Sequence, residues 1–245
     1  MASIDKTIAE VLRKMKLGKP VSSSDYPQDT YLSSGIYSHL EDMSGYTNPK
    51  RGFFGFGGGK PKEGTSSGNE YGIQFIYFID TLYPGNKQRG NTSSVSIGNK
   101  ISVKPEQKGS EVIFNVIIGE KKIKTKKYDV KEVQHPLFGS AIIFHTHPKA
   151  YLREGKSVYG FFSPQDIVSL LRGSTPLSGL VVGKKLWIAC KTKDSQMIPP
   201  DLLKKATQIE YTDGVDAIID FVRNELKEYG IVFYFGSLTG KLKKI

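Results

Sequence analysis

The segment Ala141-Ile142-Ile143-Phe144-His145-Thr146-His147-Pro148 decides the fold, because it joins an apolar run to two histidines and a proline. The apolar run predicts a buried strand, and side chains two residues apart on a strand project from the same face. The Cα atoms of His145 and His147 should then lie about 6.6 Å apart, from a rise of ~3.3 Å per residue. Two imidazoles at this separation can converge on one metal ion.

A second polar segment, Ser163-Pro164-Gln165-Asp166, follows farther along the chain. It predicts a helix start with Ser163 as N-cap and Pro164 at the first helical position. Asp166 can serve as a third metal ligand, and three N/O ligands with one position left for water are typical of catalytic zinc. Asp166 also has a purely structural explanation as a first-turn residue. The two explanations are compatible, because a helix N-terminus favours the ionised carboxylate that a metal needs.

His145-Thr146-His147-Pro148 with Ser163-Pro164-Gln165-Asp166 resembles the JAB/MPN family, whose metal-binding form is called JAMM. Asn69-Glu70-Tyr71-Gly72-Ile73 is similar to the glutamate segment of that family. The combination is most similar to JAB-like domains of bacterial secreted and polymorphic-toxin proteins. The resemblance covers roughly residues 70–191, and it implies a JAB/MPN sandwich of the cytidine-deaminase-like type.

The resemblance implies a zinc-dependent metallopeptidase or isopeptidase, a hydrolase that acts on a protein or peptide, with ubiquitin-like proteins as substrates of its best-known members. It implies His145, His147 and Asp166 as metal ligands, Glu70 as general base and Ser163 as the residue that stabilises the oxyanion. Glu111, which opens an apolar strand, is the rival candidate for the base. A toxin or effector module fits this reading. The alternative is a catalytically inactive JAB-like scaffold that binds a protein partner.

The rest of the chain predicts an α/β fold with a mixed, mainly antiparallel sheet flanked by helices. The periodicity predicts helices over residues 4–17, 164–172 and 215–229, and strands over residues 71–82, 93–103, 112–118, 122–128, 139–147, 179–182, 186–191 and 231–235. We expect an N-terminal helix and Gly-rich region in residues 1–69 and the JAB-like hydrolase domain in residues 70–245. The glycines of residues 48–69 do not form a P-loop, because Phe54 and Pro61 occupy required Gly and Ser/Thr positions.

The chain has 245 residues, a net charge of +11 and a pI near 9.5, which raises the possibility of nucleic-acid binding. Its lysines are scattered, however, and no nucleic-acid reader motif accompanies them, so we do not expect a nucleic-acid partner. An acidic protein partner is equally compatible with the charge. The lysines of residues 121–127 predict a solvated hairpin or a sheet edge, where lysine discourages edge pairing.

The composition also limits the cellular compartments in which we expect the protein. The single cysteine, Cys190, excludes an intrachain disulfide and a thiolate zinc site, and its apolar neighbours predict a buried core residue. No segment has the ~20 apolar residues of a membrane span, and the first residues lack the apolar core of a signal peptide. We expect a cytoplasmic protein, or one secreted without a classical signal peptide.

The segment Pro148–Phe162 separates the histidines from the helix that carries Asp166, and it is longer than in the family. Lys149, Arg153 and Lys156 lie within it. A loop anchored at both ends beside a metal must flank the cleft, and functional loops are often this long. We expect it to gather an acidic substrate, with a disordered insertion as the alternative.

Overall fold

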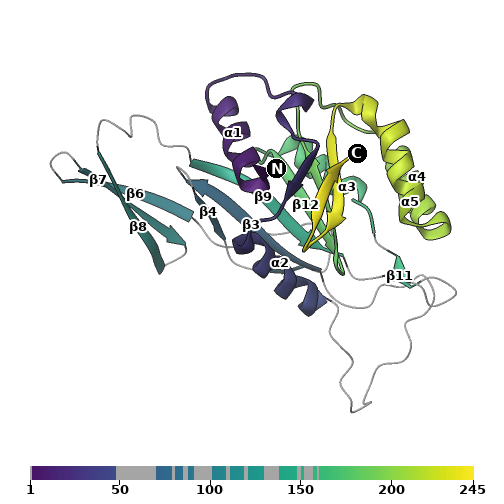
Figure 1. Cartoon of the computed structure of the whole chain (residues 1–245), viewed down its shortest axis with the longest axis horizontal. Helices are drawn as coiled ribbons and strands as arrows, with labels where there is room; N and C mark the ends of the chain where they lie inside the picture. Colours follow the sequence, from purple (N-terminus) through teal and green to yellow (C-terminus); the bar gives the residue numbers. More distant parts are fainter. Residues whose placement is uncertain are drawn as a thin grey trace, which may run out of the picture.

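A computed structural model describes residues 2–47, 70–78, 81–84, 88–90, 101–108, 111–118, 121–129, 138–147, 150–151, 157–158 and 160–245. In this part of the chain, one mixed sheet of ten strands lies between two layers of helices (Figure 1). The strands follow the order β1 (Ala2–Ser3), β2 (Asp29–Tyr31), β15 (Lys241–Lys244), β14 (Val232–Ser237), β13 (Lys185–Cys190), β12 (Leu177–Val182), β9 (Phe138–Thr146), β3 (Glu70–Phe78) and β4 (Thr81–Pro84), with β5 (Gln88–Gly90) also paired to β3.

The pairing within this sheet confirms the expected fold class. The pairs β1–β2 and β9–β12 are parallel, and the other pairs are antiparallel. The helices are α1 (Ile4–Lys16), α2 (Ser34–Thr47), α3 (Pro164–Arg172), α4 (Pro200–Asp213) and α5 (Val215–Phe221), with a short 3-10 turn η1 (Ser23–Asp25). After α5 the helical path continues through a π-turn, η2 (Val222–Leu226), and a 3-10 turn, η3 (Lys227–Tyr229). The result is a mixed, mainly antiparallel α/β sandwich.

Each face of the sheet buries its own apolar core, as alternation along β13 shows. Leu186, Ile188 and Cys190 belong to the core beneath α1 and α2. Trp187 and Ala189 belong to the opposite core, beneath α3, α4 and α5. A strand covered on both faces reads as a continuous apolar run, which is why its strand character was evident from the sequence. Cys190 is buried as expected, and burial raises the pKa of its thiol.

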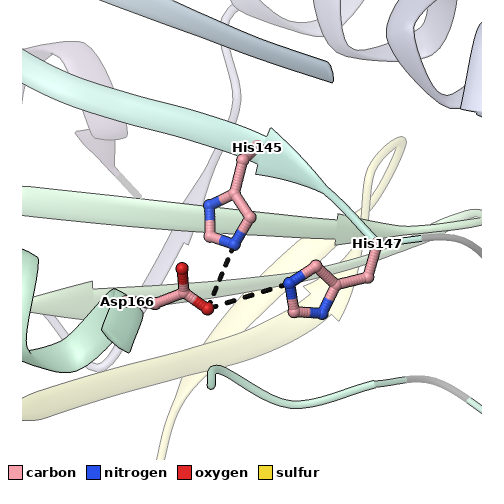
Figure 2. A group of neighbouring side chains, drawn as sticks. All are labelled: His145, His147 and Asp166. Carbon is pink, nitrogen blue, oxygen red and sulfur yellow. Dashed lines mark ion pairs between the residues drawn. The ribbon is translucent and has the colours of Figure 1, made fainter. Parts of the chain in front are cut away.

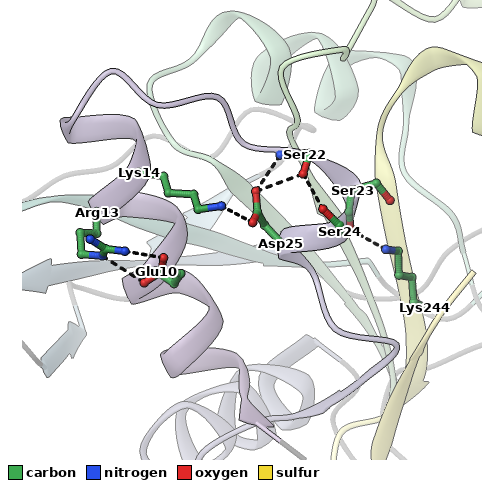
Figure 3. A network of polar contacts seen from close by, with 8 residues as sticks. All are labelled: Glu10, Arg13, Lys14, Ser22, Ser23, Ser24, Asp25 and Lys244. Atoms are coloured by element: carbon green, nitrogen blue, oxygen red, sulfur yellow. Dashed lines mark hydrogen bonds and ion pairs between the residues drawn. The ribbon is translucent and has the colours of Figure 1, made fainter.

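The N-terminal residues take part in the same sheet. The Lys244 ammonium group at the end of β15 donates to the carbonyl oxygens of Ser23 (2.6 Å) and Tyr26 (3.2 Å). Lys14 of α1 contacts the Asp25 carboxylate, which also accepts the backbone N–H of Ser22 at 2.8 Å (Figure 3). These bonds tie α1 and η1 to the C-terminal strand. The Gly-rich region of residues 48–69, which includes the domain boundary expected at residue 69, lies outside the described residues.

Three further strands form a second antiparallel sheet in the order β6 (Ile101–Lys108), β7 (Glu111–Ile118) and β8 (Lys121–Asp129). The lysine-rich strand β8 is at an edge of this sheet, which confirms the expectation for residues 121–127. The start of the strand predicted over residues 93–103 lies outside the described residues. Two further short strands, β10 (Ala150–Tyr151) and β11 (Ser157–Val158), pair antiparallel within the segment that precedes α3.

The sequence prediction differs from the structure at four elements of the fold: one strand was predicted wrongly, and two helices and one strand were missed. The single strand expected over residues 71–82 is two strands, because β4 folds back onto β3 with Phe78 paired to Thr81. Helices α2 and α4 were not predicted, although Ile36, Leu40 and Met43 of α2 are buried at helical spacing. Strand β15 was also missed. Three lysines around one buried leucine, Leu242, gave no strand signal.

A tight contact between neighbouring central strands yields a stability prediction. A Cβ added to Gly179 of β12 would lie 2.1 Å from Cδ1 of Phe144 on β9. Gly179→Ala should therefore destabilise the protein by about 1–3 kcal/mol, because the close-packed core must shift to admit the methyl group. Urea denaturation measures the effect. Gly35→Ala is the control, since an added Cβ there meets nothing within 4 Å.

A double-variant cycle tests the cause. Phe144→Leu removes the ring edge that the new methyl group meets, so it should cost less in the Gly179→Ala background than in the wild type. Additive losses would show that the clash with Phe144 is not the source of the destabilisation.

Candidate metal centre

Strand β9 carries both histidines to the C-terminal end of the central parallel pair. His145 pairs with Leu180 of β12, and the backbone N–H of His147 donates to the carbonyl oxygen of Val181 at 3.0 Å. This bond continues the pairing one residue past the end of β9, so both side chains face the same side of the sheet. That side is the one covered by α3, and the His145 ring lies 6.2 Å from the Phe162 ring just before α3.

Helix α3 presents Asp166 to the histidines through its first turn. Ser163 is the N-cap, and its side-chain oxygen accepts the backbone N–H of Asp166 at 3.3 Å. In return, Oδ2 of Asp166 accepts the backbone N–H of Ser163 at 2.8 Å and its hydroxyl at 2.7 Å. This reciprocal capping box confirms the predicted helix start. It also holds the Asp166 carboxylate in one orientation.

The three side chains converge on one point (Figure 2). Nε2 of His145 lies 3.4 Å from Oδ2 of Asp166, and Nε2 of His147 lies 3.7 Å from the same oxygen. All three potential ligand atoms are within 4.8 Å of one another. Ligands on bonds of ~2.1 Å around a tetrahedral zinc ion are themselves about 3.4 Å apart. The spacing of these side chains therefore fits a metal ion held by the two imidazoles and the carboxylate.

Burial and charge favour a cation at this point. The side chains of His145 and Asp166 are 4% and 3% exposed, and that of His147 is 17% exposed. Burial and the neighbouring His145 lower the pKa of His147 to about 4, so its imidazole is neutral at pH 7. Burial raises the pKa of Asp166, but His145, His147 and Ser163 outweigh it and lower this pKa to about 2. A neutral imidazole and an ionised carboxylate are the forms in which these groups bind metals.

For the two candidate general bases, Glu70 and Glu111, the structure describes the position of the backbone. The backbone of Glu70 begins β3, two residues before Gly72, which pairs with His145. Strand β3 is thus adjacent to the strand of the histidines. Glu111 begins β7 in the separate three-stranded sheet, which projects at the opposite side of Figure 1 from α3. The catalytic roles of Glu70 and Ser163 stay predictions.

Gly160 contributes to the site in a way that the sequence analysis did not foresee. A Cβ added to Gly160 would lie 3.4 Å from Nδ1 of His147 and 3.8 Å from Cγ2 of Val182. The segment that leads into α3 thus returns against the second histidine. Lys149, Arg153 and Lys156, which were expected to gather substrate, lie outside the described residues.

Comparisons with protein-family models, curated proteins and solved structures found no match. Within the part of the chain that the structure describes, no helix is long and apolar enough to cross a membrane.

The pKa of His147 predicts how the metal-free protein responds to acid. The unfolded chain takes up a proton near pH 6.5, whereas the folded protein resists it until about pH 4. The free energy of unfolding should therefore fall as pH drops from 6.5 to 4, by up to about 1.4 kcal/mol per pH unit from this group. Urea denaturation in the presence of a chelator measures the slope. His147→Ala should have a shallower slope, and an equal slope in both proteins would contradict the assignment.

Proposed function

We propose that this protein is a zinc-dependent hydrolase that cleaves a peptide or isopeptide bond, as its resemblance to the JAB/MPN family implies. The observation that carries the proposal is the convergence of His145, His147 and Asp166, whose ligand atoms lie within 4.8 Å of one another. These residues come from a strand end and a helix start that are separate in the sequence. Their meeting supports a site built for an ion.

The donor set favours a transition metal over magnesium or calcium, and the family resemblance selects zinc among the transition metals. Imidazole nitrogen is a good ligand for zinc, whereas magnesium and calcium prefer sites made of oxygen atoms. Among the residues that the structure describes, the cluster contains three protein ligands, the number typical of catalytic zinc. The partial exposure of His147 supports access to the ion from solvent on that side.

The proposed chemistry assigns one task to each residue. A bound zinc ion would polarise the carbonyl of the scissile bond and lower the pKa of its bound water to about 7. Glu70 takes the proton of the attacking water and returns it to the leaving amine. Ser163 donates a hydrogen bond to the oxyanion, a contribution of about 3 kcal/mol when a single donor is removed. To do so, the Ser163 hydroxyl must turn from Asp166, to which it donates here at 2.7 Å.

Metal binding is the first test of the proposal. The purified protein, stripped with a chelator and dialysed against zinc, should contain about one zinc ion per chain by atomic emission. His147→Ala should abolish stoichiometric binding while the fold persists by circular dichroism, because it removes one of three ligands. His39→Ala is the control, since His39 packs against Phe75 rather than at the site. Undiminished zinc in His147→Ala would refute the ligand set.

The choice of general base gives a second test. Glu70→Gln should retain zinc and lose hydrolysis, because an amide cannot accept the proton of the water. Cleavage can be followed on a fluorogenic amide of a ubiquitin-like C-terminus and on a proteome-derived peptide mixture read by mass spectrometry. Glu111→Gln is the matched control. If Glu111→Gln alone silences the protein, Glu111 is the base. Zinc binding without cleavage of any substrate would favour the scaffold function instead.

A further inference from the structure

One short segment borders both histidines of the candidate metal centre before it enters α3. The Phe162 ring lies 6.2 Å from the His145 ring. Two residues earlier in the chain, a Cβ added to Gly160 would lie 3.4 Å from Nδ1 and 3.9 Å from Cβ of His147. Because this segment lies against both imidazoles, whatever fixes its backbone also limits the orientations that the two rings can adopt.

Buried aromatic rings fix the segment in place. The residues that follow Gly160 are Phe161 and Phe162, which are 4% and 0% exposed. The Phe161 ring lies 4.9 Å from the Trp187 ring, and both phenylalanine rings lie close to Phe233, at 5.7 and 6.4 Å. A close-packed core resists displacement of its side chains. The backbone of Gly160 therefore cannot move far without disturbing these contacts.

The imidazole of His147 is the more movable neighbour of Gly160. Its backbone is held by the hydrogen bond from its N–H to the carbonyl oxygen of Val181 at 3.0 Å, but its side chain is 17% exposed. The other neighbour is Val182, whose Cγ2 would lie 3.8 Å from the added Cβ and which is 1% exposed. A larger side chain at position 160 would therefore displace the imidazole before it displaced the valine.

A displaced imidazole would no longer point at the metal centre. Nδ1 of His147 lies on the side of Gly160, whereas Nε2 points to Oδ2 of Asp166 at 3.7 Å (Figure 2). Side chains that bind a metal must stay within ~10–20° of their productive orientation. A ring pushed from its Nδ1 edge would turn Nε2 away from the point on which the ligand atoms converge. The space beside Nδ1 thus preserves that convergence.

The backbone itself does not require glycine at position 160. Among the glycines that the structure describes, those with a positive φ angle, which favours glycine, are Gly18, Gly183, Gly214 and Gly230. Gly160 is not one of them, so its φ angle is open to residues with a side chain. The contact with His147 is therefore the constraint that the structure places on this position.

We propose that Gly160 is a positioning residue of the metal centre, whose missing side chain lets the His147 imidazole direct Nε2 to the ion. This inference rests on the proposed zinc site and adds to it a residue outside the ligand set. Residues that orient metal ligands without touching the metal often affect its affinity as much as tenfold or more, to about 100-fold.

Zinc affinity tests the proposal without any measurement of hydrolysis. Gly160→Val should raise the Kd for zinc about tenfold, because its branched side chain displaces the ligand ring. Gly160→Ala should stay close to the wild type, because a single Cβ makes an ordinary contact at 3.4 Å. The Kd is measured by competition with a chromophoric chelator. Gly35→Val is the control, since an added Cβ at Gly35 meets nothing within 4 Å.

Cobalt substitution reports the geometry of the ligands directly. The visible absorption bands of the Co²⁺-loaded Gly160→Val protein should shift or lose intensity relative to the wild type, whereas those of Gly160→Ala and Gly35→Val should not. A residue that only supports the fold would lower the stability of the protein and leave these bands unchanged.

A double-variant cycle tests whether His147 is the side chain that is displaced. In metal-free protein, Gly160→Val should lower the free energy of unfolding less in the His147→Ala background than in the wild type, because the ring that it meets is absent. Urea denaturation in the presence of a chelator measures both losses.

Two results would overturn the inference. One is a Gly160→Val protein with the zinc Kd and the cobalt spectrum of the wild type. The other is an equal loss of unfolding free energy from Gly160→Val in both backgrounds. Failure of the proposed hydrolase function is seen separately, as absent cleavage by a wild-type protein that binds zinc more tightly than Gly160→Val does.

Discussion

The register of β9 against β12 is the constraint on which both the core and the candidate metal centre depend. Phe144 faces the core beneath α1 and α2 and rests against Gly179, while His145 faces α3. Because side chains alternate along a strand, a slip of one residue would place an imidazole in the apolar core and a phenyl ring at the metal centre. The close fit of Phe144 over Gly179 therefore stabilises the fold and also fixes the face of the sheet from which the histidines project.

Asp166 serves the helix and the metal centre with the same carboxylate. As a first-turn residue it completes the capping box with Ser163, and the helix N-terminus favours its negative charge. A carboxylate that is 3% exposed needs compensation for lost solvation. The capping hydrogen bonds provide part of it without a metal, so the geometry can persist before an ion binds. A site organised in this way pays little conformational entropy when the ion arrives.

Local signals explain which parts of the structure were predictable. Helix α3 was predicted with its observed bounds, because Ser163, Pro164 and Gly173 mark its ends. Strand β9 was predicted to within a residue from its apolar run. The convergence of His145, His147 and Asp166 was predicted from spacing and from the family resemblance together. By contrast, β15 exists because Leu242 is buried when the strand lies between β14 and β2, a long-range condition that its own sequence does not express.

The same distinction separates the two lysine-rich regions of the chain. The lysines of residues 121–127 are neighbours in sequence, and their position on an edge strand followed from composition alone. Lys185 and Lys243 are far apart in sequence, and only the pairing of β13, β14 and β15 puts them on the face of the histidines. A net charge of +11 describes both regions equally and locates neither. Composition gives the sign and the size of the charge, whereas strand register decides which lysines share a face of the sheet.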